Sequence, residues 1–165
     1  MIQADTDERA EGYVFLPGKA ELRWLGATST AFLATGEKTS GAFALVDERA
    51  PQGESVPLHR HPADVESFYV LEGEVTFFLG DGEGVRAPAG SFVHLPGGVV
   101  HGFRVESETA RYLILTTAQH GEFYRAITAP SAPGGGRQDD PINGAQIKRA
   151  SQEYGIEFVG PLPEA

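Results

Sequence analysis

Short apolar runs, interrupted every few residues by Gly, Pro or Asp, dominate the chain from Tyr13 to Thr117. No segment in this stretch has the pattern of a convincing helix, whereas runs of this length are typical of β-strands. The expected strands are Tyr13–Leu16, Glu21–Leu25, Thr30–Thr35, Ala42–Asp47, Ser55–His59, Ser67–Leu71, Glu74–Leu79, Val85–Ala87, Phe92–Leu95, His101–Glu106 and Arg111–Thr116. Regularly spaced short strands with turn residues between them predict a β-sandwich or barrel.

Two turns are well marked in this pattern. Glu72-Gly73 separates two strongly apolar runs, which predicts a tight hairpin. Asp81-Gly82 is a favoured pair for a type I′ turn, in which both central residues need a positive φ. The chain therefore has hairpin connections of the kind that join antiparallel strands.

The pattern changes after Thr117. His120–Ile127 is expected to form a short helix, and the Pro/Gly-rich stretch 129–140 a mobile loop. Ala145–Tyr154 has its apolar positions at helical spacing, and Gly155 is placed to end that helix. We therefore expect one domain over residues 1–165, with a barrel at about 13–117 and a helical extension at about 118–165.

Composition and charge narrow the classes of partner. The formal net charge of −10 opposes contact with a phosphate backbone, so nucleic acid is not expected to bind. The chain has no Cys, which excludes disulfides and thiolate metal sites. The N-terminal residues are acidic without an apolar signal region, and no run of 18 apolar residues follows. We expect a cytoplasmic protein that is not bound to a membrane.

The histidines of the β-rich region predict a metal site. His59 and His61 are two residues apart, so on a strand their imidazoles project from one face. Glu66 stands at an odd offset, and Pro62-Ala63-Asp64 offers a turn that can return its side chain to that face. His101 follows a Pro-Gly-Gly turn that can bring its strand to the opposite wall.

Three imidazoles and one carboxylate suit a single divalent transition metal: Fe, Ni, Co, Mn, Cu or Zn. Four protein ligands leave open positions on a metal that accepts five or six, which is characteristic of catalytic sites. The alternative interpretation of the same residues is a polar strand edge with solvated imidazoles.

Two sets of positions resemble the sequence motifs of the cupin superfamily. The first motif is matched at Gly53, His59, His61, Glu66 and Gly73, and the second at Gly90, Pro96, Gly98 and His101. The final Asn of the second motif is replaced by Val105. The segment from Thr116 to Pro161 is similar to the tail of single-domain bacterial cupins of the quercetin 2,3-dioxygenase-like group.

This resemblance implies an all-β cupin fold, a double-stranded β-helix or jelly-roll barrel with short C-terminal helices. It implies that His59, His61, Glu66 and His101 hold the metal. Glu66 is then either a ligand alone or also the catalytic residue that takes the substrate proton as general base, the role that the resemblance to quercetinases implies. Cupins of this kind usually form homodimers through N-terminal strands, which the Tyr13–Leu25 region would supply here.

Three functions are compatible with these residues. The leading hypothesis is a dioxygenase that uses O2 on a flavonol-like or other enolizable aromatic small molecule. The second is a non-oxidative metal-assisted isomerase or cyclase, of the polyketide or sugar-acid type. The third is a cupin that binds a small ligand without turnover. Consumption of O2 separates the first from the second.

The sequence is less informative about where three further side chains lie. His94 shares a strand face with Phe92 and either points into the cavity or, as is more common, faces outward. His120, at the start of the short helix, is expected at the surface near the barrel rim. Trp24 packs either over the barrel or across a dimer interface. The aromatic residues are expected to line the interior on a period of two.

Overall fold

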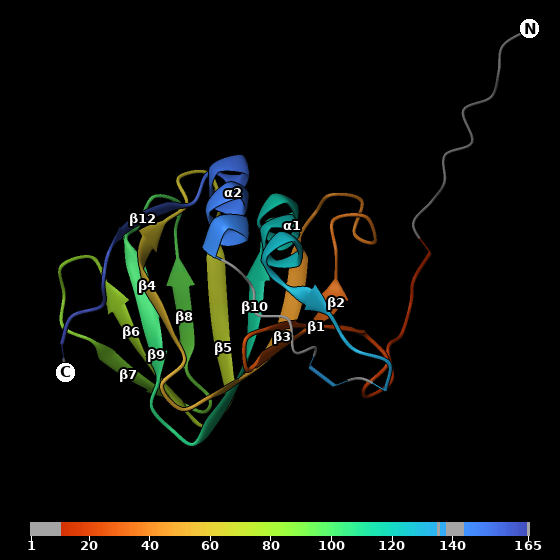
Figure 1. The fold of residues 1–165 in the computed structure, drawn as a ribbon, viewed down its shortest axis with the longest axis horizontal. Helices are drawn as coiled ribbons and strands as arrows, with labels where there is room; N and C mark the ends of the chain where they lie inside the picture. The colour runs from red at the N-terminus through yellow and green to blue at the C-terminus, as the bar shows by residue number, and fades with distance from the viewer. Residues whose placement is uncertain (1–10, 135, 138–143, 165) are drawn as a thin grey trace, which may run out of the picture.

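Two antiparallel β-sheets face one another, and two short helices lie over one end of them (Figure 1). The computed structural model describes residues 11–134, 136–137 and 144–164. Neither of the two helices in this part of the chain is long and apolar enough to cross a membrane. The sheets meet along a shared apolar interior, as the strand pattern of the sequence predicts.

The larger sheet carries one wall of the interior. Its strands are β1 (Glu21–Leu25), β2 (Thr28–Ala34), β3 (Ala44–Pro51), β5 (Glu66–Glu72), β8 (Phe92–Leu95), β10 (Thr109–Thr116) and β11 (Ala129–Pro130). They pair in the order β11-β1-β2-β3-β10-β5-β8. In β2 and β3 buried and less buried residues alternate, because successive side chains of a strand point to opposite faces.

The smaller sheet forms the opposite wall. Its strands are β4 (Ser55–Arg60), β6 (Glu74–Leu79), β7 (Val85–Pro88), β9 (His101–Val105) and β12 (Glu157–Gly160). They pair in the order β12-β4-β9-β6-β7, so the last strand of the chain covers the edge of β4. In the described residues the two sheets do not close into a barrel through hydrogen bonds, and the expectation of a closed barrel is wrong in that respect.

The core between the sheets is aromatic. The rings of Phe68, Phe77, Phe103 and Tyr112 contact one another with centroids 5.0–5.9 Å apart, and all four side chains are buried. Edge-to-face contacts of this kind contribute beyond the area that they bury. This cluster packs β5 and β10 of the larger sheet against β6 and β9 of the smaller sheet, and β5 and β9 carry Glu66 and His101 of the candidate site.

Helices α1 (Ala118–Ile127) and α2 (Gly144–Tyr154) pack on each other at one end of the sheets (Figure 1). The side chain of Thr117 caps α1 by accepting a hydrogen bond from the backbone N–H of His120 at 3.1 Å. Both helices were expected within two residues of these bounds, and Gly155, with φ of +73°, follows α2 as predicted.

Several local predictions are wrong. Residues 13–16 form no strand, whereas β11 and β12 were not expected. Glu72-Gly73 is a tight turn, but it leads from β5 in the larger sheet to β6 in the smaller sheet, so the hairpin expected there is wrong. The second turn does join the paired strands β6 and β7, and the residue with positive φ there is Gly80 rather than Asp81 or Gly82. Much of the loop expected at 129–140 lies in described structure, of which Ala129–Pro130 pairs with β1, while residues 135 and 138–140 lie outside the described residues.

Candidate metal centre

The candidate site lies at the end of the sheets that the helices cover, and it joins the two walls. His59 and His101 are direct cross-strand partners on β4 and β9 of the smaller sheet. Glu66 is the first residue of β5 in the larger sheet. His61 follows β4, in the connection that crosses from one sheet to the other. The strand pairing therefore brings the imidazoles to one wall and the carboxylate to the other.

A turn between His61 and Glu66 makes this possible. The backbone N–H of Gly98 donates to the carbonyl of His61 at 3.2 Å, which fastens the Pro96-Gly97-Gly98 turn to the first turn. A Cβ on Gly97 would lie 2.7 Å from the carbonyl oxygen of Pro62, too close for any other residue. The approach of these two turns explains the glycine and confirms the face reset expected at Pro62-Ala63-Asp64.

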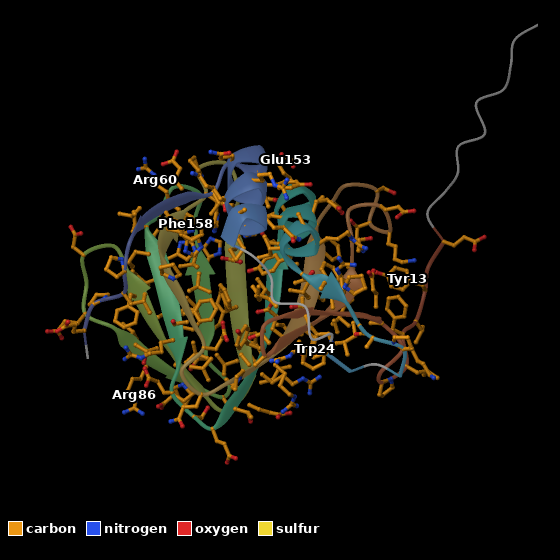
Figure 2. All side chains as sticks on the ribbon, in the orientation of Figure 1. Tyr13, Trp24, Arg60, Arg86, Glu153 and Phe158 are labelled. Atoms are coloured by element: carbon orange, nitrogen blue, oxygen red, sulfur yellow. The ribbon has the colours of Figure 1, made fainter. Side chains whose placement is uncertain are left out.

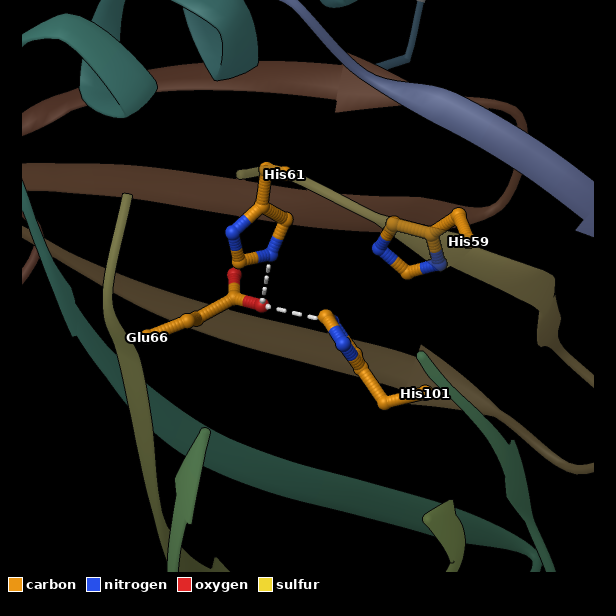
Figure 3. A group of neighbouring side chains, drawn as sticks. All are labelled: His59, His61, Glu66 and His101. Atoms are coloured by element: carbon orange, nitrogen blue, oxygen red, sulfur yellow. Dashed lines mark ion pairs between the residues drawn. The ribbon is translucent and has the colours of Figure 1, made fainter. Parts of the chain in front are cut away.

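The four expected side chains converge. Each offers one ligand atom, and these atoms of His59, His61, Glu66 and His101 all lie within 4.8 Å of one another (Figure 3). All four residues are buried, between 1% and 8% exposed. A polar strand edge with solvated imidazoles is therefore the wrong interpretation of these residues.

Hydrogen bonds fix the orientation of each imidazole. The Nδ1 atoms of His59, His61 and His101 lie 2.8–2.9 Å from the backbone carbonyls of Pro57, Asp64 and Val99 respectively. A carbonyl oxygen can only accept, so each Nδ1 carries the proton. The neutral form of each ring then presents the lone pair of Nε2 to the centre, which is the form that binds a metal.

The centre contains unpaired polar atoms. Nε2 of His61 and of His101 are buried without a hydrogen-bond partner. They lie 3.4 Å and 3.3 Å from Oε2 of Glu66, the contacts drawn as dashed lines in Figure 3. Two lone pairs facing a carboxylate in a buried site repel it unless a cation lies between them. The donor set and its orphaned nitrogens therefore fit a divalent metal.

The protonation states agree with this interpretation. Burial, together with the neighbouring His101, lowers the pKa of His59 to about 4, so this ring is neutral at pH 7. Burial raises the pKa of Glu66, but with no cation between them the rings of His101, His120 and His61 can donate hydrogen bonds to it, and these outweigh burial and hold its pKa well below the ordinary value. The same contact raises the pKa of His61 against the effect of burial. Glu66 is thus a carboxylate at neutral pH, as a metal ligand must be.

Two residues of α1 complete the surroundings of Glu66. The hydroxyl of Tyr124 donates to Oε1 of Glu66 at 2.5 Å, and Nε2 of His120 lies 3.4 Å from the same oxygen. His120 is only 2% exposed, so the expectation that it lies at the surface is wrong. Tyr124 was not singled out at all. The sequence shows only that Tyr124 shares a helix face with His120, since residues four apart lie on one face, and it does not show that this face meets Glu66.

A cavity of about 260 Å³ lies beside these groups. His59, Glu66, His120 and Tyr124 stand on its wall. Most of the remaining lining is apolar and comes from both sheets, both helices and the C-terminal strand: Leu25, Val56, Pro57, Phe103, Phe123, Ile127, Ile147, Ile156 and Phe158. Pockets of roughly this size, apolar with a few convergent polar groups, are typical of small-molecule sites, whose volumes begin near ~300 Å³.

The C-terminal strand helps to close this cavity. Phe158 on β12 is the Cα partner of His59, and its ring centroid lies 6.0 Å from that of the imidazole. The adjacent Glu157 accepts a hydrogen bond of 2.6 Å from Nε of Arg60. Figure 2 shows Arg60 and Phe158 at the same end of the molecule as the helices. The end of the chain is therefore part of the site.

The other uncertain side chains lie away from the centre. His94 is exposed on the outer face of β8, where its Nδ1 lies 2.8 Å from Oγ of Ser67. Phe92 is 65% exposed, so it does not line the interior. Trp24 donates from Nε1 to Oγ of Ser131 at 3.1 Å, which ties β1 to the segment that follows β11.

Comparison with known proteins agrees with the motifs. Residues 46–116 match the family model described as Cupin domain. This part of the chain is similar to the cupin superfamily. The chain is also 29% identical over 119 residues to quercetin 2,3-dioxygenase from Bacillus subtilis (strain 168); the aligned region covers 72% of this chain and 35% of that relative. The chain thus spans about a third of the length of the curated relative that it matches.

Solved structures share the fold over much of this chain. The polyketide cyclase RemF from Streptomyces resistomycificus has a TM-score of 0.60 at 20% identity, over 86% of this chain and 97% of that one. KdgF from Halomonas sp. has a TM-score of 0.58 at 17% identity, over 66% of this chain and 94% of that one. A predicted oxalate decarboxylase from Thermotoga maritima has a TM-score of 0.57 at 22% identity, over 64% of this chain and 98% of that one. At these identities the likeness concerns the fold.

Proposed function

We propose that this protein is a metal-dependent cupin oxygenase that acts on a flavonol-like or other enolizable aromatic small molecule. The observation that carries the proposal is the pair of buried, unpaired Nε2 atoms of His61 and His101 that face the carboxylate of Glu66 beside an apolar cavity. The similarity to quercetin 2,3-dioxygenase supports the choice of chemistry. The substrate class is inferred from this similarity and from the apolar cavity together.

In this proposal His59, His61, Glu66 and His101 hold one divalent transition metal: Fe, Ni, Co, Mn, Cu or Zn. Their ligand atoms lie within 4.8 Å of one another, and the three imidazoles are oriented by backbone carbonyls. A metal bound there supplies a Lewis acid toward a substrate oxygen. Mixed imidazole and carboxylate ligation accepts any of these ions, so geometry and cellular supply decide which is bound.

Glu66 has a second role as the base that removes the proton of the substrate hydroxyl. It is ionised at neutral pH, because the imidazoles hold its pKa well below the ordinary value against the effect of burial. Tyr124 holds Oε1 and thereby sets the direction of the carboxylate. A base that is ionised, oriented and buried beside the cavity can accept a proton without exposure to bulk water.

The cavity positions the substrate and excludes water from it. Phe103 and Phe123 present aromatic surface to the cavity, and Ile127 adds aliphatic surface. A flat apolar molecule gains hydrophobic contact there while its hydroxyl reaches Glu66. Exclusion of water also protects an activated aromatic anion from reprotonation by solvent.

Oxygen uptake tests the proposal directly. The purified protein, loaded in turn with each candidate metal, is given a flavonol in an oxygen electrode while the product is followed by mass spectrometry. The expected result is uptake of O2 in proportion to substrate lost, absent in the metal-free protein. Turnover that continues under strict anaerobiosis overturns the oxygenase and leaves a non-oxidative isomerase or cyclase. Binding without any turnover leaves a ligand-binding cupin.

A further inference from the structure

A second carboxylate, Glu48, lies on the wall of the same cavity and has no role in the chemistry above. Glu48 is on β3, only 7% exposed, at a position where its neighbours on the same face, Val46 and Ala50, are fully buried. Its Cα partners on the flanking strands are Thr30 on β2 and Tyr112 on β10. Three polar side chains thus form a row across the inner face of the larger sheet.

The fold provides few hydrogen bonds or ion pairs that would offset the cost of burying the carboxyl group of Glu48. The hydroxyl of Thr30 donates to Oε1 of Glu48 at 2.8 Å, and among the described residues no Lys or Arg forms an ion pair with it. Burial, together with the charge of nearby Glu66, raises the pKa of Glu48 to about 7 against the effect of the Thr30 and Tyr112 hydroxyls. An apolar residue would suit a purely structural position better.

A second, independent observation indicates a ligand at this wall. Thr28, two residues before Thr30 on the same strand face, is 5% exposed and lines the cavity. Its hydroxyl is buried with no hydrogen-bond partner. The Glu54 carboxylate lies nearby: burial raises its pKa and the Thr28 hydroxyl opposes that rise, but the two side chains form no hydrogen bond of normal geometry. An unpaired hydroxyl on a cavity wall lacks the partner that a ligand would supply.

The register of β10 separates this wall from the metal centre. Glu48 is opposite Tyr112, whereas Glu66 is opposite Thr116. Four residues along a strand correspond to about 13 Å between the two backbone positions. Both carboxylates nevertheless line one cavity. A substrate of more than one ring can therefore meet Glu66 at one end and Glu48 at the other.

We propose that Glu48 and Thr28 form a subsite for a hydroxyl group on the end of an aromatic substrate that lies away from the metal centre. A hydroxyl group both donates and accepts, so it can give its hydrogen to Glu48 and receive one from Thr28. The surrounding lining is apolar, and this selects hydroxylated aromatic molecules over sugars. The inference rests on the proposed function only in taking this cavity as the substrate site.

Calorimetric titration of the metal-loaded protein without O2 tests the subsite separately from turnover. The probes are quercetin and its parent flavonol, which keeps the hydroxyl beside the ketone but lacks the others. We expect the wild type to bind quercetin at least about tenfold more tightly than flavonol. Glu48→Gln should reduce this ratio about tenfold and Thr28→Val about threefold, without a similar loss of flavonol binding.

Two features of the design keep the result interpretable. Thr28→Val removes a hydroxyl that has no partner, so it should fold at least as well as the wild type. Ser29→Ala removes a hydroxyl from the adjacent, less buried position of the same strand and should leave the ratio unchanged. Equal affinity of the wild type for both probes, no binding of either, or an unchanged ratio in both variants overturns the subsite.

The subsite and the oxygenase can fail independently. Selective binding of quercetin that Glu48→Gln abolishes, with no O2 uptake, supports the subsite and removes the oxygenase. Uptake of O2 by a protein that binds both probes equally supports the oxygenase and removes the subsite.

Discussion

The hydroxyl of Tyr124 hydrogen-bonds to Oε1 of Glu66 at 2.5 Å, while the other oxygen of the same carboxylate faces His61 and His101. The two oxygens of Glu66 therefore have different partners, a helix residue on one side and the imidazoles on the other. Burial and the negative charge of Glu66 hold the pKa of Tyr124 well above the ordinary value, so the hydroxyl remains a donor. Helix α1 thus controls the direction of the carboxylate.

Removal of this hydroxyl should separate orientation from metal binding. Tyr124→Phe loses a hydrogen bond to a charged group, worth about 1.5–3 kcal/mol, and we expect turnover to fall about tenfold or more while the metal content stays near that of the wild type. Elemental analysis and initial rates check this. Tyr154→Phe, on the neighbouring helix and packed on Phe123, is the matched control. Unchanged turnover, or loss of the metal, would contradict the role given to Tyr124.

Loss of one imidazole should empty the candidate metal centre. His101→Ala removes a buried ligand, and we expect the metal content to fall from about one ion per chain to near zero after dialysis. His94→Ala is the matched control, because His94 lies on the same part of the chain but on the exposed outer face. Plasma mass spectrometry measures both. Equal metal content in the two variants would show that the metal is bound elsewhere.

Substitution of the proposed base should stop turnover while the metal stays bound. Glu66→Gln keeps three imidazoles and the shape of the side chain, so we expect metal to be retained at reduced affinity. An amide cannot accept the substrate proton, and turnover should fall by at least about a hundredfold. Retention of full activity in a metal-loaded Glu66→Gln enzyme would mean that Glu66 is not the base.

The stability of the fold should depend on the ionisation of Glu48. Burial raises its pKa from an ordinary 4.5 to about 7, so between these pH values the folded state binds more protons than the unfolded chain. The free energy of unfolding therefore falls as pH rises through this window, by up to about 3 kcal/mol in total, and then levels off above pH 7.

Comparison with Glu48→Gln isolates this effect from other titrating groups. Urea unfolding at closely spaced pH values between 4.5 and 8 should show the variant gaining stability relative to the wild type as pH rises. A difference between the two proteins that is constant over this range would mean that Glu48 ionises as freely in the folded state as in the unfolded chain.

Close packing of α1 against β3 should make Gly121 sensitive to substitution. A Cβ at this position would lie 2.3 Å from Cβ of Ala44, so Gly121→Ala must push the helix from the sheet. We expect a loss of about 1–3 kcal/mol in the free energy of unfolding and a weaker hold of Tyr124 on Glu66.

A double-mutant cycle gives the control for Gly121. Ala44→Gly removes the opposing Cβ, and the Gly121→Ala, Ala44→Gly double variant should regain much of the stability lost by Gly121→Ala. Additive losses in the double variant would place the origin of the effect elsewhere. Urea unfolding of the four proteins measures the coupling.

The sequence by itself predicted which side chains converge in the candidate metal centre more completely than it predicted the fold around them. The spacing of His59 and His61 is a property of any strand, and the Pro-Gly turns with their flanking ligands are recognisable in the chain as written. Most strands were placed correctly for the same reason, since their apolar runs are local. The homodimer built on Tyr13–Leu25 and the single domain over 1–165 stay predictions.

Only the tertiary structure decided what surrounds that centre. The surface expectation for His120 failed because a helix does not indicate which of its faces meets a distant site, and Tyr124 went unnoticed for the same reason. Glu48 lies in a strand whose pattern allows either a core or a solvent position for a carboxylate. Its burial follows from the pairing of β3 with β2 and β10. Such side chains become functional candidates through contacts between residues far apart in the chain, and the local pattern of the sequence contains no record of those contacts.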